Sequence, residues 1–377
     1  MSVQKPKRVP IHHKAAKKYF ARLKEKNVLA KDEFHIINEN ERQAIRAVSR
    51  KAMMLAAVYG VLGVALFYIP QYVFPEFFAQ FSQNESVFGF EFSVNLFTIG
   101  YSLFLIFLEI FLLTRINIWA VASAANACGF PDKRDAHFDM HLDQLLNVGM
   151  EARNKETLKF GIDPYEGIPK FYIFLFTVWN MIKATLTNFL VKLVAVKIFA
   201  RAQLRQYADL VGIPVFALWN AFATMRIIRN AKVYIMAPSI IHQVVERLSY
   251  LKEDKNVKQN IFDAMQYIVG VKRSFHHNHF LLVRRLIDVF DLTHFKDEET
   301  DRKAFLGKIK NADPAMKMAY SKLIVLGIFI DGRISLREKK ALTELYENGV
   351  ILINPAKSKK WCRQFLRGEG LDDFIDA

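Results

Sequence analysis

Residues 52–75 read AMMLAAVYGVLGVALFYIPQYVFP and contain no charged side chain. A helix needs about 20 apolar residues to cross the hydrocarbon core of a bilayer. Lys51 precedes this stretch, and Tyr68 and Tyr72 lie near its far end, where interfacial residues are expected. The stretch therefore predicts a membrane-spanning helix.

A second apolar run begins at Phe92 and closes at Arg115. The link between the runs, residues 76–91, holds three glutamates and neither lysine nor arginine. Residues 1–51 hold 14 basic and 5 acidic residues, a net charge of +9. Because basic residues concentrate on the cytoplasmic side of a membrane, we expect a hairpin over 52–127 with both ends in the cytoplasm.

Glu109 is the single charge inside the second apolar run. An acid within a membrane span is frequently functional. It also lies close enough to the end of the run to reach water or Arg115, so a purely structural role stays open beside the functional one.

The composition narrows the class of protein. The 377 residues include 53 Lys and Arg against 37 Asp and Glu, together with 33 Phe and two Cys. This mixture excludes a disordered chain and a disulfide scaffold, and both cysteines are expected to be reduced thiols. The basic excess lies beside apolar segments and has no nucleic-acid motif with it, so we expect membrane lipid, chiefly anionic, as the partner and no nucleic acid. Residues 1–51 are predicted to be a basic helical segment in the cytosol.

A second apolar region covers residues 171–245, after a cytosolic linker region at 128–170. It holds 8 basic residues and one acid, and its uncharged runs are too short for ordinary spans. We predict a basic helical hairpin that is re-entrant or interfacial, with two further spans as the alternative. Its expected lipid-facing residues are Lys183, Lys192, Lys197, Arg226, Arg229 and Lys232.

Residues 213–220, IPVFALWN, are followed by Met225, Arg226 and Arg229. This pattern resembles the closing segment of EcsC-type bacterial proteins, which also pair an apolar turn with an Asn and a basic helix. The resemblance covers residues 185–240. It departs from the family at Phe216 and Leu218, where a glycine-rich run is expected. The resemblance implies membrane association.

Residues 246–377 alternate amphipathic helical patterns with polar breaks, and no segment of the chain shows strong strand alternation. Asp313-Pro314 predicts a helix start, and Ser335 is expected to cap the following helix. The predicted fold is all-α. It consists of an integral membrane hairpin, a second apolar basic hairpin and a soluble C-terminal helical domain.

Within that domain, Asp331, Gly332, Ile334, Ser335 and Glu338 form a segment similar to the helix–turn–helix centre of TerB-like (tellurite-resistance-type) domains. The similarity covers about 314–346. It implies a domain that sits on membrane-linked assemblies, and some such domains bind metal through acidic clusters. Asp331 and Glu338 are therefore candidate ligands for a divalent metal, with a capped structural turn as the alternative.

His137 and His141 are one helical turn apart, a spacing that suits a transition metal. The alternative is that both histidines flank a packing face. No phosphate-binding loop, dinucleotide fingerprint, HExxH or GxSxG motif accompanies them. The sequence names no reaction.

Three functions fit these patterns. The first is a non-catalytic membrane anchor and adaptor, in the bacterial inner membrane, that binds protein partners through 246–377. The second is a membrane transport component in which Glu109 and the lysines of 171–200 line a polar path. The third is a metal-dependent, membrane-associated enzyme.

Overall fold

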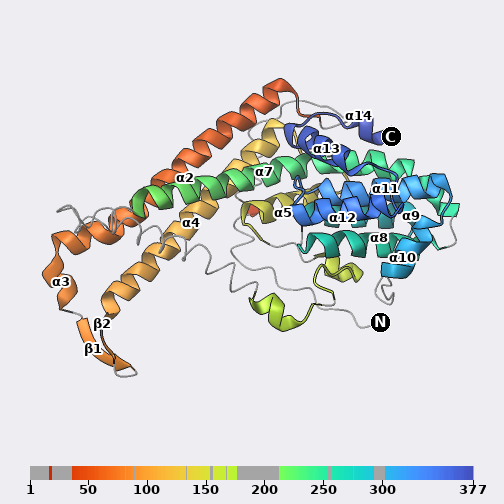
Figure 1. Cartoon of the computed structure of the whole chain (residues 1–377). Coiled ribbons are helices and arrows are strands. Elements are labelled where there is room, and N and C mark those ends of the chain that lie inside the picture. Colours follow the sequence, from red (N-terminus) through yellow and green to blue (C-terminus); the bar gives the residue numbers. More distant parts are fainter. Residues whose placement is uncertain are drawn as a thin grey trace, which may run out of the picture. The chain divides into compact units, whose positions relative to one another are not determined.

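The structure is a computed structural model. It describes residues 17–18, 36–80, 82–87, 90–132, 134–152, 156–166, 168–175, 212–253, 256–274, 276–292 and 302–376. The predicted all-α class is confirmed (Figure 1). The helices are α2 (Glu39–Val73), α3 (Pro75–Ala79), α4 (Leu96–Ala127), α5 (Phe138–Gly149), α7 (Gly212–Arg247), α8 (Val257–Lys272), α9 (His277–Phe290), α10 (Arg302–Lys310), α11 (Pro314–Phe329), α12 (Leu336–Glu347), α13 (Pro355–Arg367) and α14 (Asp372–Ile375), with 3₁₀ turns η1 (Glu156–Phe160) and η3 (Ser249–Glu253).

One small hairpin corrects the expectation that strand patterns are absent. Strands β1 (Ser82–Val87) and β2 (Phe90–Asn95) pair antiparallel, with Ser82 opposite Asn95 and Val87 opposite Phe90. Residues 90–94, FEFSV, do alternate apolar and polar side chains, but five residues are a weak signal beside two long apolar runs. The hairpin shortens the second apolar helix, which begins at Leu96 instead of Phe92.

The chain forms two compact units. The first, here called the helical unit, comprises 1–45, 121–168 and 227–377, and the second, the hairpin unit, comprises 46–120 and 169–226. The helical unit thus includes segments on the N-terminal side of residue 246.

In the hairpin unit, α2 and α4 run antiparallel, and individual contacts join them near both ends of the pair. The Tyr101 hydroxyl donates a hydrogen bond of 2.6 Å to the Leu66 carbonyl, and the Lys51 ammonium lies 5.4 Å from the centre of the Trp119 ring. Both helices are apolar and long enough to cross a membrane. Their large apolar side chains are exposed, up to 72% for Met54 and 71% for Phe107.

The helical unit has the opposite arrangement, with its apolar side chains inside. Most apolar side chains of α7 after residue 226 are buried, including Ile227, Ile228 and Tyr234, and α8 packs against α11. Near the C-terminus the Phe374 ring lies 5.2 Å from that of Phe329 and 4.9 Å from that of Trp361. These contacts form an ordinary close-packed core.

Two predicted helix starts are confirmed. The Asp313 carboxylate accepts hydrogen bonds from the backbone N–H groups of Ala315 and Met316 and begins α11. Ser335 and Glu338 form a reciprocal capping box at the start of α12, in which each side chain accepts from the other residue's backbone N–H. The capping box fixes the turn between α11 and α12.

Both cysteines are free thiols buried in the helical unit. The exposed fraction of Cys128 is 3% and that of Cys362 is 6%. Burial raises the pKa of Cys128 to about 12 and that of Cys362 to about 11. The two thiols therefore remain protonated at neutral pH in the folded protein.

Gly327 allows the close contact between α11 and α8. A Cβ at this position would lie 2.5 Å from Ile268 Cδ1, so Gly327→Ala should lower the free energy of unfolding by about 1–3 kcal/mol through overpacking. Gly307, in α10, is the matched control because a Cβ there meets nothing within 4 Å. Gly307→Ala should raise stability by about 0.5–1 kcal/mol, since alanine favours the helix.

The measurement is urea unfolding of the full chain in mild detergent, monitored by circular dichroism. Equal stability of the two variants would contradict this packing of α8 on α11.

Candidate functional site

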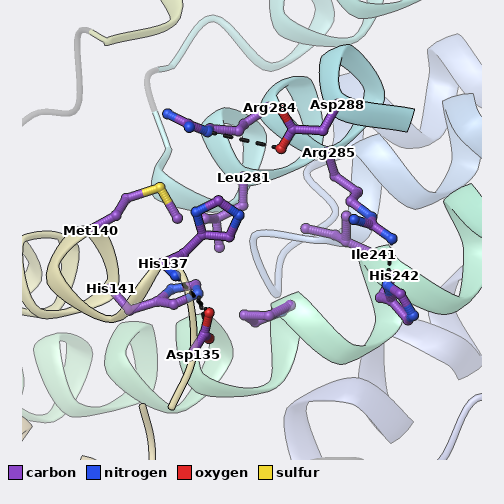
Figure 2. Close-up of a pocket in the computed structure, with 11 residues that line it drawn as sticks. Asp135, His137, Met140, His141, Ile241, His242, Leu281, Arg284, Arg285 and Asp288 are labelled. Carbon is purple, nitrogen blue, oxygen red and sulfur yellow. Dashed lines mark hydrogen bonds and ion pairs between the residues drawn. The ribbon is translucent and has the colours of Figure 1, made fainter. Parts of the chain in front are cut away.

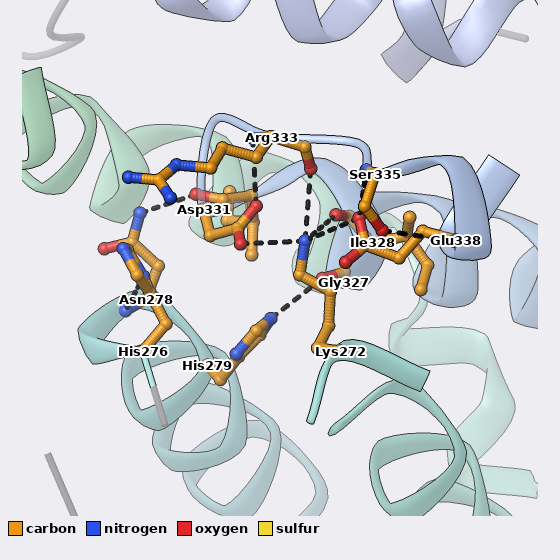
Figure 3. A network of polar contacts seen from close by, with 11 residues as sticks. Lys272, His276, Asn278, His279, Gly327, Ile328, Asp331, Arg333, Ser335 and Glu338 are labelled. Carbon is orange, nitrogen blue, oxygen red and sulfur yellow. Dashed lines mark hydrogen bonds and ion pairs between the residues drawn. The ribbon is translucent and has the colours of Figure 1, made fainter. Parts of the chain in front are cut away.

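The most strongly built polar site in the helical unit is a buried ion cluster around Lys272, the last residue of α8 (Figure 3). The Lys272 ammonium lies 2.7 Å from an Asp331 carboxylate oxygen and 3.1 Å from a Glu338 carboxylate oxygen. The Lys272 side chain is 1% exposed, against 10% for Asp331 and 8% for Glu338. These three charges are taken out of water together.

Backbone oxygens complete the surroundings of the ammonium. Lys272 Nζ donates to the carbonyl of Ile328 at 2.9 Å and to that of Arg333 at 3.1 Å. An ammonium has three N–H donors, and four oxygen acceptors surround this one. The two carboxylates that the sequence offers as metal ligands, Asp331 and Glu338, therefore form ion pairs with a lysine.

The turn between α11 and α12 places both acids. Gly332 has a φ of +74°, a backbone conformation that favours glycine. A Cβ there would also lie 2.8 Å from Val233 Cγ2 and 2.9 Å from Leu366 Cδ2, so both the backbone and the neighbouring side chains disfavour any other residue. The Asp331 carboxylate accepts from the Arg333 N–H at 3.0 Å, which closes the turn. Glu338 contributes to the capping box and to the ion cluster at once.

The pKa of Asp331 reflects two opposing effects. Burial by itself would raise it, but the Lys272 ammonium outweighs burial and holds the pKa below its ordinary value. Asp331 is therefore ionised at neutral pH, as an ion pair with Lys272 requires.

Three histidines lie at the start of α9, and two of them, His276 and His279, are beside this cluster (Figure 3). The His276 side chain caps the helix by accepting from the Asn278 N–H. The His277 Nδ1 lies 2.6 Å from the Gln144 side-chain oxygen, and the His279 Nε2 lies 2.9 Å from the Gly327 carbonyl. Burial lowers the pKa of His276 to about 3 and those of His277 and His279 to about 4. All three imidazoles are neutral at physiological pH.

The other histidine pair of the sequence lies at a small cavity between α5, α7 and α9 (Figure 2). The buried His141 ring has Nδ1 at 2.8 Å from the Tyr234 hydroxyl and Nε2 at 3.5 Å from an Asp135 carboxylate oxygen. The cavity has a volume of about 190 Å³. Its polar lining includes Asp135, His137, His141, His242, Arg284 and Arg285.

This cavity offers both donors and acceptors above an apolar base formed by Pro238, Ile241 and Leu281. Arg285 contacts His242 at 2.8 Å and is paired with Glu246. Small-molecule sites usually have volumes of about 300–1,000 Å³, so the cavity has room only for a small polar solute. In the parts of the chain that the structure describes, no group of three or more His, Cys, Asp or Glu side chains is placed to hold a metal ion.

Glu109 lies in the hairpin unit and contacts Asn220, a pairing that the sequence analysis did not predict. One carboxylate oxygen accepts a hydrogen bond of 2.7 Å from the Asn220 side-chain amide of α7. A Cβ at Gly63 of α2 would lie 3.4 Å from the other oxygen. Glu109 is thus surrounded by α2, α4 and α7.

The expected lipid-facing residues fall into two groups. Lys183, Lys192 and Lys197 lie outside the described residues, as does most of the basic segment 1–51. Arg226 is exposed and Arg229 half-buried, whereas the Lys232 ammonium donates a hydrogen bond of 2.6 Å to the Leu366 carbonyl inside the helical unit.

Comparison with known proteins gives no family: no protein-family model, curated protein or solved structure matches this chain. The resemblances to EcsC-type proteins and to TerB-like domains therefore stay predictions.

The ion cluster predicts a large effect of Lys272. Lys272→Met leaves Asp331 and Glu338 buried without their cation, so the free energy of unfolding should fall by about 3–5 kcal/mol. Lys340→Met is the control, because that ammonium is 80% exposed and lies 3.8 Å from Glu344, and it should cost less than about 0.5 kcal/mol. Urea unfolding of both full-length variants measures the difference, and equal losses would refute a structural ion cluster.

The buried histidines predict a stability that depends on pH. Between pH 6.5 and about 4, the unfolded chain binds protons that folded His277 and His279 exclude, so stability falls as the pH is lowered through this window. The slope should reach about 1.4 kcal/mol per pH unit for each histidine. Unfolding measured at pH 7.5, 6 and 5 tests this, and His277→Gln should flatten the slope; a wild-type stability that is independent of pH would contradict it.

Proposed function

We propose that this chain is a non-catalytic integral membrane protein that acts as an anchor and adaptor. The hairpin unit is embedded in lipid, and the helical unit binds protein partners in the cytoplasm. The observation that carries the proposal is the contrast between exposed apolar side chains in the first unit and buried ones in the second.

The exposed surfaces of α2 and α4 support the membrane part. Phe104, Phe107 and Phe111 of α4 are each at least 62% exposed, and so is Met54 of α2. Leaving this much contiguous apolar surface in water is unfavourable, at about 25 cal/mol per Å². Contact with acyl chains removes that cost.

The charges support an orientation. Arg46, Arg50 and Lys51 of α2 and Arg115 of α4 lie at the same end of the antiparallel pair, because Lys51 contacts Trp119. The acidic link 76–91 is at the other end. The positive-inside rule then places the basic end in the cytoplasm, next to anionic lipid, and a bacterial inner membrane fits this arrangement.

An exposed leucine supports the adaptor part. Leu336, at the start of α12, is 86% exposed on an otherwise well-packed unit. It lies within the segment that resembles TerB-like domains, and that resemblance implies membrane-linked assemblies. We place the partner-binding surface at α12.

A transport component is the second candidate, and the observation in its favour is the contact of Glu109 with Asn220. In an apolar layer, a carboxylate with an amide partner is a typical ion or proton site. Flux through proteoliposomes that Glu109→Gln alters would favour transport over the adaptor.

The adaptor function predicts two results. The full chain should stay in the membrane fraction after extraction with high salt or alkaline carbonate, which release proteins held by charge alone. In mild-detergent purification, the proteins captured by the wild type should be lost from Leu336→Ser and retained by the matched control Lys339→Ser.

Release of the chain by salt would refute the membrane anchor. Identical capture by both serine variants would refute a partner surface at α12.

A further inference from the structure

The first part of α7 has its polar side chains inside and its apolar side chains outside. Asn220 and Thr224 are one helical turn apart and both contact α4. Asn220 donates to Glu109 at 2.7 Å, and the buried Thr224 hydroxyl donates to the Asn117 side-chain oxygen at 3.0 Å. This is the reverse of the pattern expected for a helix on the surface of a water-soluble protein.

The outward side chains of the same segment are large and apolar. The exposed fractions are 71% for Leu218, 39% for Trp219 and 45% for Phe222. Residues 212–225 contain no charge, and Arg226 follows directly. At 1.5 Å per residue these 14 residues are about 21 Å long, which covers most of a hydrocarbon core of about 30 Å.

Gly60 brings α7 against α2. A Cβ at Gly60 would lie 2.8 Å from backbone atoms of Phe216 and Ala217, so only glycine allows this approach. Close backbone contact at a small residue is typical of helix pairs inside membranes, where packing and hydrogen bonds replace the hydrophobic effect.

Basic residues of α2, α4 and α7 lie at the same height along the three helices. The contact of Thr224 with Asn117 places Arg226 of α7 beside the part of α4 that follows Arg115. The contact of Lys51 with Trp119 places Lys51 of α2 at the same level. On the side of these basic residues that leads into the apolar runs, residues 52–73 of α2, 110–114 of α4 and 212–225 of α7 contain no charge. The next charged residue of α4 is Glu109, which accepts a hydrogen bond from Asn220. Such a level marks where a helix leaves the hydrocarbon.

We propose that residues 212–225 are a third bilayer-embedded segment, with Leu218, Trp219 and Phe222 against acyl chains and Asn220 and Thr224 turned to the polar side chains of α4. The segment enters from the cytoplasmic side at Arg226. This inference rests on the membrane location proposed above, and it assigns the outer face of α7 to lipid instead of to a second protein.

The test is fluorescence quenching of the full chain in vesicles whose phospholipids carry bromine on their acyl chains. Trp219 is partly exposed, so Trp219→Phe preserves the fold and isolates the emission of Trp219 by difference. Trp219 should lose the larger part of its emission in brominated vesicles relative to unbrominated ones, and aqueous iodide should have little effect on it.

Two added tryptophans separate this inference from the proposed function. Phe107→Trp on α4 should be quenched by brominated lipid, and Leu336→Trp on α12 should be quenched by iodide alone. Quenching of Phe107→Trp with an unquenched Trp219 would overturn the third segment, because protein or water would then cover α7, while the membrane anchor would stand. If brominated lipid quenched neither, the membrane location and the third segment would both be refuted.

Discussion

The ammonium of Lys272 is the contact on which the arrangement of the helical unit depends. It connects the end of α8 to the last turn of α11, to the turn that follows and to the first turn of α12. Asn278 extends the same network, since its amide donates to the carbonyls of Ile330 and Val233 at 2.6 and 3.3 Å. Because a buried charge is tolerated only with its partners in place, these helices have one mutual arrangement.

The elements that local sequence determines were predictable. The caps at Asp313 and Ser335 and the two apolar helices follow from residues within one or two turns of one another. Lys272 was not predictable, because a lysine ending an amphipathic helix usually compensates the helix dipole in water. Its partners are 56 to 66 residues away in sequence. The contact between Glu109 and Asn220 was not predictable for the same reason, because these two residues are 111 positions apart.

The histidine patterns illustrate why residue type does not settle chemistry. His137 and His141 have the spacing of metal ligands, yet His141 is occupied by Tyr234 and Asp135. The run at 276–279 begins a helix and fills the space beside the ion cluster. In each case at least one ring nitrogen contacts another group of the protein, such as Tyr234 for His141 and the Gly327 carbonyl for His279.

The two buried thiols can report local opening of the helical unit. Cys362 lies in α13 and Cys128 just after α4. Both thiols are protonated and shielded from solvent in the folded protein. A maleimide can modify either thiol only during moments when its surroundings open, so each modification rate reports the frequency of a local opening. Because the two positions belong to separate segments of the unit, unequal rates would distinguish fraying of one segment from opening of the whole.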